Sequence, residues 1–235
     1  GDLLIGADGV KSVVRTLFDP QPAHFTGHVA VRALVSIDEA LREFADKPGN
    51  FIGHNRTVVY YPLRGGTLLN LVFFSRQEGW TEDGWTIPAT QAELQQMFAG
   101  WCAPVQTIIA RTDPASLFKW AINARSKLPT WTFADRVVLM GDAAHAMTPF
   151  LGQGASSAIE DGVVLGRALA ASATRAEGLR RYEAARMERA SLIQAESNAQ
   201  ANRMQDKDTD NFDKKVLRNE ETLGLFGYDS GTVAV

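Results

Sequence analysis

The sequence lacks several features that would assign it to a class at once. Its 235 residues include a single cysteine, Cys102, which excludes an internal disulfide and a cysteine-based metal site. It contains no apolar run of about 20 residues, the length that a membrane-spanning helix needs. The net charge is only −3, so no basic surface argues for nucleic acid. We therefore expect a cytoplasmic globular protein with no metal, membrane or nucleic-acid partner.

Two glycine-containing stretches also fail as phosphate-binding fingerprints. Residues 152–157 lack the third glycine of a GxGxxG motif and follow a Pro-Phe-Leu loop rather than a strand. Residues 6–12 contain a Lys-Ser pair, but at the wrong spacing for a P-loop. His24 and His28 are four residues apart, yet the segment between them is not helical and no carboxylate is near, so we expect no metal site there.

The most informative stretch that is present runs from Arg136 to Gly162. Residues 137–140 form a short apolar run that indicates a buried strand, and Asp142 places a carboxylate at its end. A loop with glycine and proline follows, and residues 155–170 indicate a helix. Ligands of α/β sheets lie beyond the carboxyl ends of strands, and a helix start offers unpaired N–H groups. This stretch predicts a site for an anionic or electron-rich cofactor.

The rest of the chain indicates mixed helix and sheet. Alternating or apolar runs predict strands at residues 3–5, 29–37, 56–63, 67–74 and 117–124, with a hairpin at Arg64-Gly65-Gly66. The strand at residues 3–5 is expected to be buried. Helical spacing predicts helices at residues 90–101 and 177–206, whereas residues 105–110 fit a helix or a strand. Residues 12–18 predict one or two helical turns with Val13, Val14 and Leu17 inward.

Two motifs carry a resemblance to a known family. Residues 141–162, GDAAHAMTPFLGQGASSAIEDG, resemble the second FAD-binding motif of the single-component flavin-dependent aromatic hydroxylases, the family of salicylate and para-hydroxybenzoate hydroxylase. Residues 2–15, DLLIGADGVKSVVR, resemble that family's DG motif, which serves both FAD and the nicotinamide nucleotide. The residues LFGYD at 225–229 resemble its closing residues. The family's opening strand, GxGxxG turn and helix have no counterpart here, so we expect a missing N-terminal FAD-binding segment.

The resemblance implies an α/β (α+β) fold in three parts. Residues 1–22 and 127–176 would form part of a Rossmann-like FAD-binding domain. Residues 23–126 would form an inserted β-rich substrate domain, and residues 177–235 a C-terminal helical segment. The long helix in this last segment could serve a homodimer.

The resemblance also names candidate cofactor residues for FAD and NAD(P)H. Asp142 would accept hydrogen bonds from ribitol hydroxyls, although an aspartate there could also only stabilise the loop. Lys11 and Arg15 could meet a pyrophosphate or nucleotide phosphate, or they could be solvated helix charges. His145 is expected to fix the loop through a hydrogen bond. The full cofactor set is Asp8, Gly9, Arg15, Asp142, Pro149, Gly152, Gln153, Gly154 and Ala155.

The substrate pocket has weaker candidates. A hydroxylase acting on a phenol gains by removing the phenolic proton, and His54, Tyr60 or Tyr61 could do so, with Arg32 nearby in the predicted sheet. Alternate residues of a strand face opposite sides, so only one of the two tyrosines can face a ligand that the sheet covers. An ordinary structural role is the open alternative for each.

The implied activity is hydroxylation of a small aromatic substrate by an FAD-dependent monooxygenase that uses NAD(P)H, O2 and a C4a-hydroperoxyflavin. An epoxidase or a reductase of the same superfamily shares both motifs. A non-catalytic remnant or interaction module that has lost FAD is the alternative from a different class.

Overall fold

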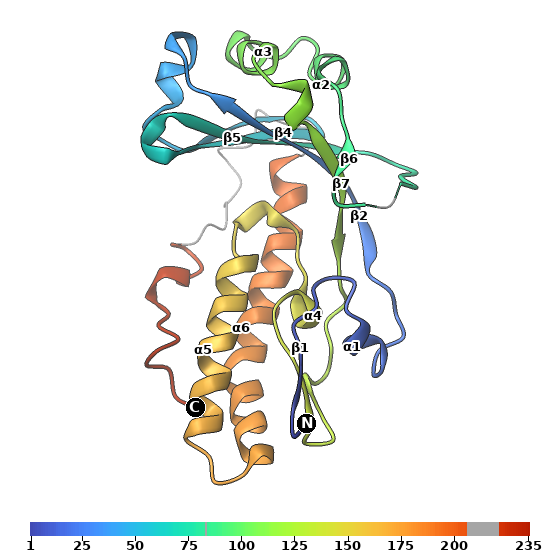
Figure 1. The fold of residues 1–235 in the computed structure, drawn as a ribbon, viewed down its shortest axis with the longest axis vertical. Helices are drawn as coiled ribbons and strands as arrows, with labels where there is room; N and C mark the ends of the chain where they lie inside the picture. The colour runs from blue at the N-terminus through green and yellow to red at the C-terminus, as the bar shows by residue number, and fades with distance from the viewer. Residues whose placement is uncertain (83, 206–220) are drawn as a thin grey trace. The chain divides into compact units, whose positions relative to one another are not determined.

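The computed structural model describes residues 1–82, 84–205 and 221–235, drawn in Figure 1. The expected break at residues 206–215 and the start of the closing segment at 216–220 lie outside them. The described residues form two compact units. Unit 1 holds Gly1–His24, Asn123–Arg203 and residues 221–235, and unit 2 holds Phe25–Ile122 with Met204 and Gln205. No helix in these ranges is long and apolar enough to cross a membrane.

Unit 1 is built on a small sheet with strand order β1-β9-β8. Strand β1 (Leu4–Gly6) is parallel to β9 (Val137–Leu139), which is antiparallel to β8 (Thr132–Phe133). The parallel pair brings the carboxyl ends of β1 and β9 to one edge, although about 130 residues separate them. The short segments α1 (Val13–Thr16), α4 (Asp142–His145) and η4 (Pro149–Leu151) lie in the loops that follow these two strands.

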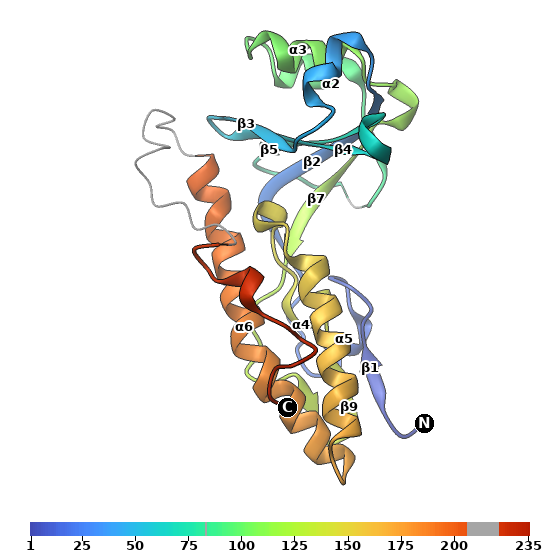
Figure 2. The same ribbon diagram turned by 90° about the vertical axis from the view of Figure 1, so that its left-hand side faces the viewer.

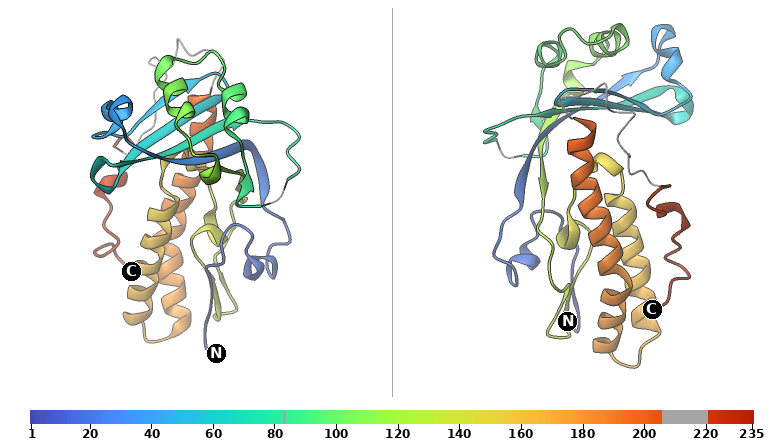
Figure 3. Two further views of the ribbon diagram at one scale, coloured as in Figure 1. Left: turned by 45° about the horizontal axis from the view of Figure 1, so that its top comes forward. Right: turned by 180° about the vertical axis from the view of Figure 1, so that it is seen from behind.

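Two long helices complete unit 1. Figure 2 shows α5 (Gly154–Ala170) and α6 (Arg175–Met204) side by side, with the C-terminal residues, including η6 (Leu225–Gly227), along them. The same pair appears from behind in Figure 3. Both helices were predicted from the sequence. They bury a common core against the sheet, made of Trp131, Val138, Leu139, Ala143, Val164, Leu165, Ala168, Leu179, Tyr182 and Ala190.

Two details of unit 1 correct the sequence predictions. The strand β1 is not buried, because within the described ranges β9 is its only partner and Leu4 and Ile5 are about half exposed. The turn α1 follows its prediction only in part, because Val14 packs against the core as expected but Val13 and Leu17 do not. Val13 and Leu17 are exposed and Arg15 is fully buried, because polar contacts rather than apolar packing orient this turn.

Unit 2 is a six-stranded sheet with the order β3-β4-β5-β2-β7-β6. Its strands are β2 (His24–Ser36), β3 (Gly49–Gly53), β4 (Arg56–Leu63), β5 (Leu68–Arg76), β6 (Ile87–Pro88) and β7 (Phe118–Ala124). The strand pairs β2–β5, β3–β4, β4–β5 and β6–β7 are antiparallel. The predicted hairpin is confirmed, with η2 (Arg64–Gly66) joining β4 to β5.

Helices cover one face of this sheet, as Figure 1 shows for α2 (Gln91–Met97) and α3 (Ala103–Ala110). The segments η1 (Glu39–Phe44) and η3 (Pro114–Ser116) complete the unit. Helix α2 is shorter than predicted: a capping box between Thr90 and Glu93 starts it, and the chain leaves it before Gly100, whose φ is +78°. The core on this face includes Val31, Ala33, Val35, Val58, Leu69, Leu71, Phe73, Leu94 and Ile108.

Candidate cofactor-binding site

The edge where β1 and β9 end opens into a cavity of ≈ 510 Å³ in unit 1. Three segments line it: the loop after β1, the loop after β9, and the first turns of α5. The lining residues are Ala7, Gly9, Met140, Gly141, Asp142, Met147, Thr148, Pro149, Gly152, Gly154, Ala155 and Ala158. This volume lies within the range of small-molecule and cofactor pockets, about 300–1,000 Å³. The cavity is mostly apolar, and among the described residues that line it Asp142 is the only charged one.

Asp142 presents a carboxylate without a protein partner. Within the described ranges its side chain makes no hydrogen bond and no ion pair, unlike a loop-stabilising aspartate. Solvent reaches the residue, yet desolvation by the surrounding protein raises the pKa of its carboxyl, and the charge of His145 opposes this only in part. An unpaired acceptor held at the wall of a cavity is suited to the hydroxyl groups of a ligand.

Helix α5 begins at the same cavity. Its N-cap residue, Gln153, gives no side-chain capping bond, so the first amides of the helix are not capped by a side chain. Such amides, together with the helix dipole, favour negative charge at this end of α5. Gly152 directly before them has φ +65°, which favours glycine, and an added Cβ would meet nothing within 4 Å. The backbone is therefore open to a ligand at this point.

A buried carboxylate holds the loop in place. Asp161, on α5, is fully buried and accepts hydrogen bonds from the amide of Gly141 at 2.9 Å and from His145 Nε2 at 2.6 Å. Its other oxygen accepts from Nε of Arg186, on α6, at 2.8 Å. Desolvation alone would raise the pKa of Asp161, but His145, Arg186 and the Gly141 amide together hold it below its usual value. The expected loop-fixing bond of His145 is confirmed, with Asp161 as its partner.

Arg15 has a different role from the one that its position suggested. Its guanidinium is fully buried and donates to the carbonyls of Ala143 and Ala144, at 3.2 and 3.0 Å, and to the carbonyl of Ser126 at 2.6 Å. Its remaining donors bind Asp19, at 3.0 and 2.8 Å. All five N–H donors are used inside the protein, so Arg15 positions the two loops relative to each other and does not face a phosphate.

Asp8 is likewise a structural residue of its turn. It accepts from Ser12 Oγ at 2.5 Å and from the amides of Val13 and Val14 at 2.7 and 3.1 Å. Desolvation would raise the pKa of Asp8, but these hydrogen bonds outweigh it and lower the pKa. Its carboxylate is therefore committed to α1 and does not line the cavity, whereas the neighbouring Gly9, with φ +79°, does.

The predicted cofactor residues thus separate into two groups. Gly9, Asp142, Pro149, Gly152, Gly154 and Ala155 meet around the cavity. Asp8, Arg15 and Gln153 do not line it; Nε2 of Gln153 donates to the carbonyl of Leu151 at 3.2 Å. Three residues that hold these loops were not predicted from the sequence: Asp161, Arg186 and Arg125. The Nε of Arg125 donates to the carbonyl of Val10 at 2.9 Å.

The substrate candidates in unit 2 lie on different faces of its sheet. Tyr60 packs into the helix-covered core, with its ring centroid 5.0 Å from that of Phe44, so the prediction of a substrate-facing role is corrected. Strand alternation places Tyr61 on the opposite face, where it is 38% exposed. His54 is exposed in the turn between β3 and β4, and its Nε2 lies 2.9 Å from Asn55 Nδ2.

The pKa of Asp142 gives a testable consequence for stability. An acid whose pKa is raised by folding is destabilising when ionised, so its contribution to stability falls as the pH rises above the unfolded value, 3.8. Asp142→Asn removes this cost. We therefore expect the cofactor-free variant to have a higher Tm than the unaltered protein at pH 7, and this difference in Tm should be smaller at pH 4. Thermal unfolding followed by circular dichroism measures this difference. Equal effects at both pH values would contradict it.

These features define a site for a cofactor that has hydroxyl groups and an electron-rich or anionic part. The family model of an FAD binding domain matches residues 1–197, and the chain belongs to this family. Among its curated relatives, 3-hydroxybenzoate 6-hydroxylase 2 of Aquipseudomonas alcaligenes is 40% identical over 72% of this chain and 52% of its own length. Salicylate hydroxylase of Pseudomonas putida is 35% identical over 83% of this chain and 50% of its own length.

A solved structure shows the same relationship. The crystal structure of Klebsiella pneumoniae HpxO complexed with FAD and uric acid has a TM-score of 0.81 and 32% identity over 94% of this chain and 57% of that one. The chain spans about half the length of the curated relatives it matches. The resemblance of residues 141–162 to a flavin motif is confirmed at the level of the family.

Proposed function

We propose that the protein is an FAD-dependent monooxygenase that hydroxylates a small aromatic substrate with NAD(P)H and O2. One observation carries the proposal: the unpaired carboxylate of Asp142 and the uncapped start of α5 share one cavity in a chain of the FAD binding domain family. The names of the relatives, among them 3-hydroxybenzoate 6-hydroxylase and salicylate hydroxylase, support an aromatic acid as the substrate class.

The residues of the cavity have separate tasks in this proposal. Asp142 accepts hydrogen bonds from the ribitol hydroxyls, and the loop at Gly152 lets the backbone approach the ring. The first amides of α5 stabilise the negative charge that the ring gains on reduction. FAD bound there would supply the redox chemistry, namely hydride acceptance from NAD(P)H and activation of O2 for hydroxylation of the substrate's aromatic ring, with water as the second product of O2. Asp161 and Arg15 hold these groups in position.

The face of the six-stranded sheet opposite α2 and α3 offers the best candidate contacts for an aromatic acid. Arg32 and Asn70 lie on this face, and Arg32 Nε donates to Asn70 Oδ1 at 2.9 Å. The fully buried Nδ2 of Asn70 has no hydrogen-bond partner in the described residues. Tyr61 is directly across from Asn70 in the register. A carboxylate could bind Arg32, and a phenolic hydroxyl could bind Asn70 or donate a hydrogen bond to the hydroxyl of Tyr61.

A substitution at Arg32 tests this face. We expect Arg32→Gln to raise the KM for an aromatic carboxylate by about tenfold or more, because a charged hydrogen bond to the substrate is lost. Steady-state NAD(P)H oxidation coupled to product analysis measures KM and kcat. The matched control is Arg42→Gln, which neutralises a well-exposed arginine of the same unit. An unchanged KM for Arg32→Gln would remove Arg32 from the substrate site.

Three accompanying proposals concern the whole protein. A further FAD-binding segment that holds the ADP half would cover the half-exposed Leu4 and Ile5 of β1, consistent with the greater length of the relatives. A homodimer through α6 and a cytoplasmic location remain predictions. Light scattering of the purified protein measures the oligomeric state, and fractionation of the source cells measures the location.

Absorbance between 350 and 500 nm and NAD(P)H consumption test the proposed function. We expect a yellow protein that oxidises NAD(P)H faster in the presence of hydroxybenzoates and releases a hydroxylated product. Oxidation stimulated only by alkenes would indicate an epoxidase, and oxidation without an oxygenated product a reductase. A colourless protein that FAD cannot reconstitute would indicate a non-catalytic module.

A further inference from the structure

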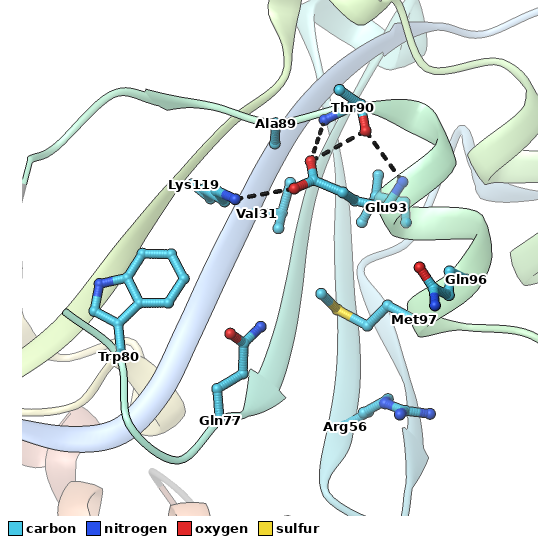
Figure 4. A pocket seen from close by; sticks show the side chains of 11 residues that line it. Val31, Arg56, Gln77, Trp80, Ala89, Thr90, Glu93, Gln96, Met97 and Lys119 are labelled. Carbon is cyan, nitrogen blue, oxygen red and sulfur yellow. Dashed lines mark hydrogen bonds and ion pairs between the residues drawn. The ribbon is translucent and has the colours of Figure 1, made fainter. Parts of the chain in front are cut away.

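A second cavity lies wholly within unit 2, at the end of the helix-covered face of the sheet. It has a volume of ≈ 430 Å³ and is lined by β2, β4, α2, β7 and the segment after β5. Figure 4 shows Trp80, Gln77 and Met97 around the hollow, with the Lys119–Glu93 pair at its upper end and Arg56 at its lower end. The candidate substrate contacts Arg32 and Asn70 lie on the opposite face of the same sheet. Arg56 shares a face of β4 with the core residue Val58, whereas Asn70 lies across from Tyr61 on the other face.

The charges that line this cavity are unevenly paired. Lys119 Nζ lies 3.0 Å from Glu93 Oε1, and Glu93 also accepts from Thr90 in the capping box of α2. This pair is therefore satisfied within the protein. Arg56 is only partly exposed, and its guanidinium has no hydrogen bond or ion pair in the described part of the chain. The cavity thus has one cation without a counter-ion, which favours an anionic ligand.

The walls add a planar, polarisable surface. The indole of Trp80 is fixed by a hydrogen bond from Nε1 to the carbonyl of Glu82 at 2.7 Å and by Lys119, whose Nζ is 5.6 Å from the ring centroid. Met97 supplies a thioether, and Val31 and Leu94 form the apolar floor where the core ends. Aromatic rings pack well against indole and thioether groups. A flat ring is therefore better suited to this space than a flexible chain.

We propose that this cavity is a binding site for a small aromatic carboxylate, with the carboxylate on Arg56 and the ring between Trp80 and Met97. The site is separate from the proposed catalytic sites and does not depend on FAD. It gives an aromatic acid a second place to bind, where occupancy can change the packing of α2 on the sheet.

Equilibrium dialysis of the purified protein with radiolabelled benzoate tests the proposal. We expect Arg56→Gln to weaken benzoate binding at this site by about tenfold or more, since a charged hydrogen bond is lost. The matched control is Arg42→Gln, which should leave benzoate binding unchanged. On the unaltered protein, benzamide lacks the charge and cyclohexanecarboxylate lacks the flat ring, so both should bind more weakly than benzoate. Circular dichroism confirms that each variant is folded.

Hydrogen exchange locates the ligand without any substitution. Benzoate should slow exchange in peptides that contain Gln77–Trp80 and Gln96–Met97. The proposal is overturned if benzoate does not bind, if Arg56→Gln binds it normally, if only Arg32→Gln loses it, or if these peptides gain no protection.

Discussion

Asp142→Ala should weaken FAD binding by about tenfold to a hundredfold, because a hydrogen bond to a charged acceptor contributes about 1.5–3 kcal/mol. The carboxylate has no protein partner to lose, so the substitution removes a ligand contact and little else. Titration of the apoprotein with FAD, followed by flavin fluorescence, measures the affinity.

The control for this variant is Glu188→Ala, which removes an exposed carboxylate of α6 in the same unit. It should bind FAD as the unaltered protein does. If Asp142→Ala also binds FAD normally, the carboxylate does not contact the cofactor, and the assignment of the cavity loses its main support.

Asp161→Ala should have the largest effect on stability, lowering the free energy of unfolding by about 3–5 kcal/mol. The substitution leaves the fully buried guanidinium of Arg186 with Glu160 as its remaining carboxylate, 2.7 Å away, and removes the acceptor of the Gly141 amide and His145. For a protein of this size the loss corresponds to a decrease in Tm of roughly 10 °C. Chemical denaturation measures the free energy.

A matched ion pair provides the control for this second prediction. Glu177 and Arg181 lie 2.7 Å apart near the start of α6, but their side chains are 33% and 39% exposed. Glu177→Ala should therefore cost no more than about 1 kcal/mol. Similar losses for the two variants would show that the buried network contributes little beyond an ordinary surface pair.

The local part of the site could be predicted from the sequence. A short apolar strand, an aspartate, a glycine-containing loop and a helix follow one another between residues 137 and 170, and each was expected where it lies. Sequence neighbours stay neighbours in such a unit, so periodicity and turn residues suffice. The chain also follows period-2 alternation in β4, which predicted that Tyr60 and Tyr61 face opposite sides.

The long-range part could not be predicted by the same means. Arg15 contacts carbonyls about 128 residues away, and nothing in its own segment signals this. Asp161 and Arg186 did leave a signal. Asp161 shares a helical face with Val164, Leu165 and Ala168, and Arg186 shares one with Leu179, Tyr182, Ala190 and Ile193. A single charge within an apolar stripe on each of two helices therefore indicates a buried ion pair.

Hydrogen exchange at the start of α5, measured on the purified protein with and without FAD, tests the central claim most directly. The account predicts that FAD slows amide exchange in peptides covering Gly152–Ala155, and that Asp142→Ala reduces this protection at the same FAD concentration. Saturating FAD binding that leaves these amides unprotected would contradict the account, because the cofactor would then lie elsewhere on the protein.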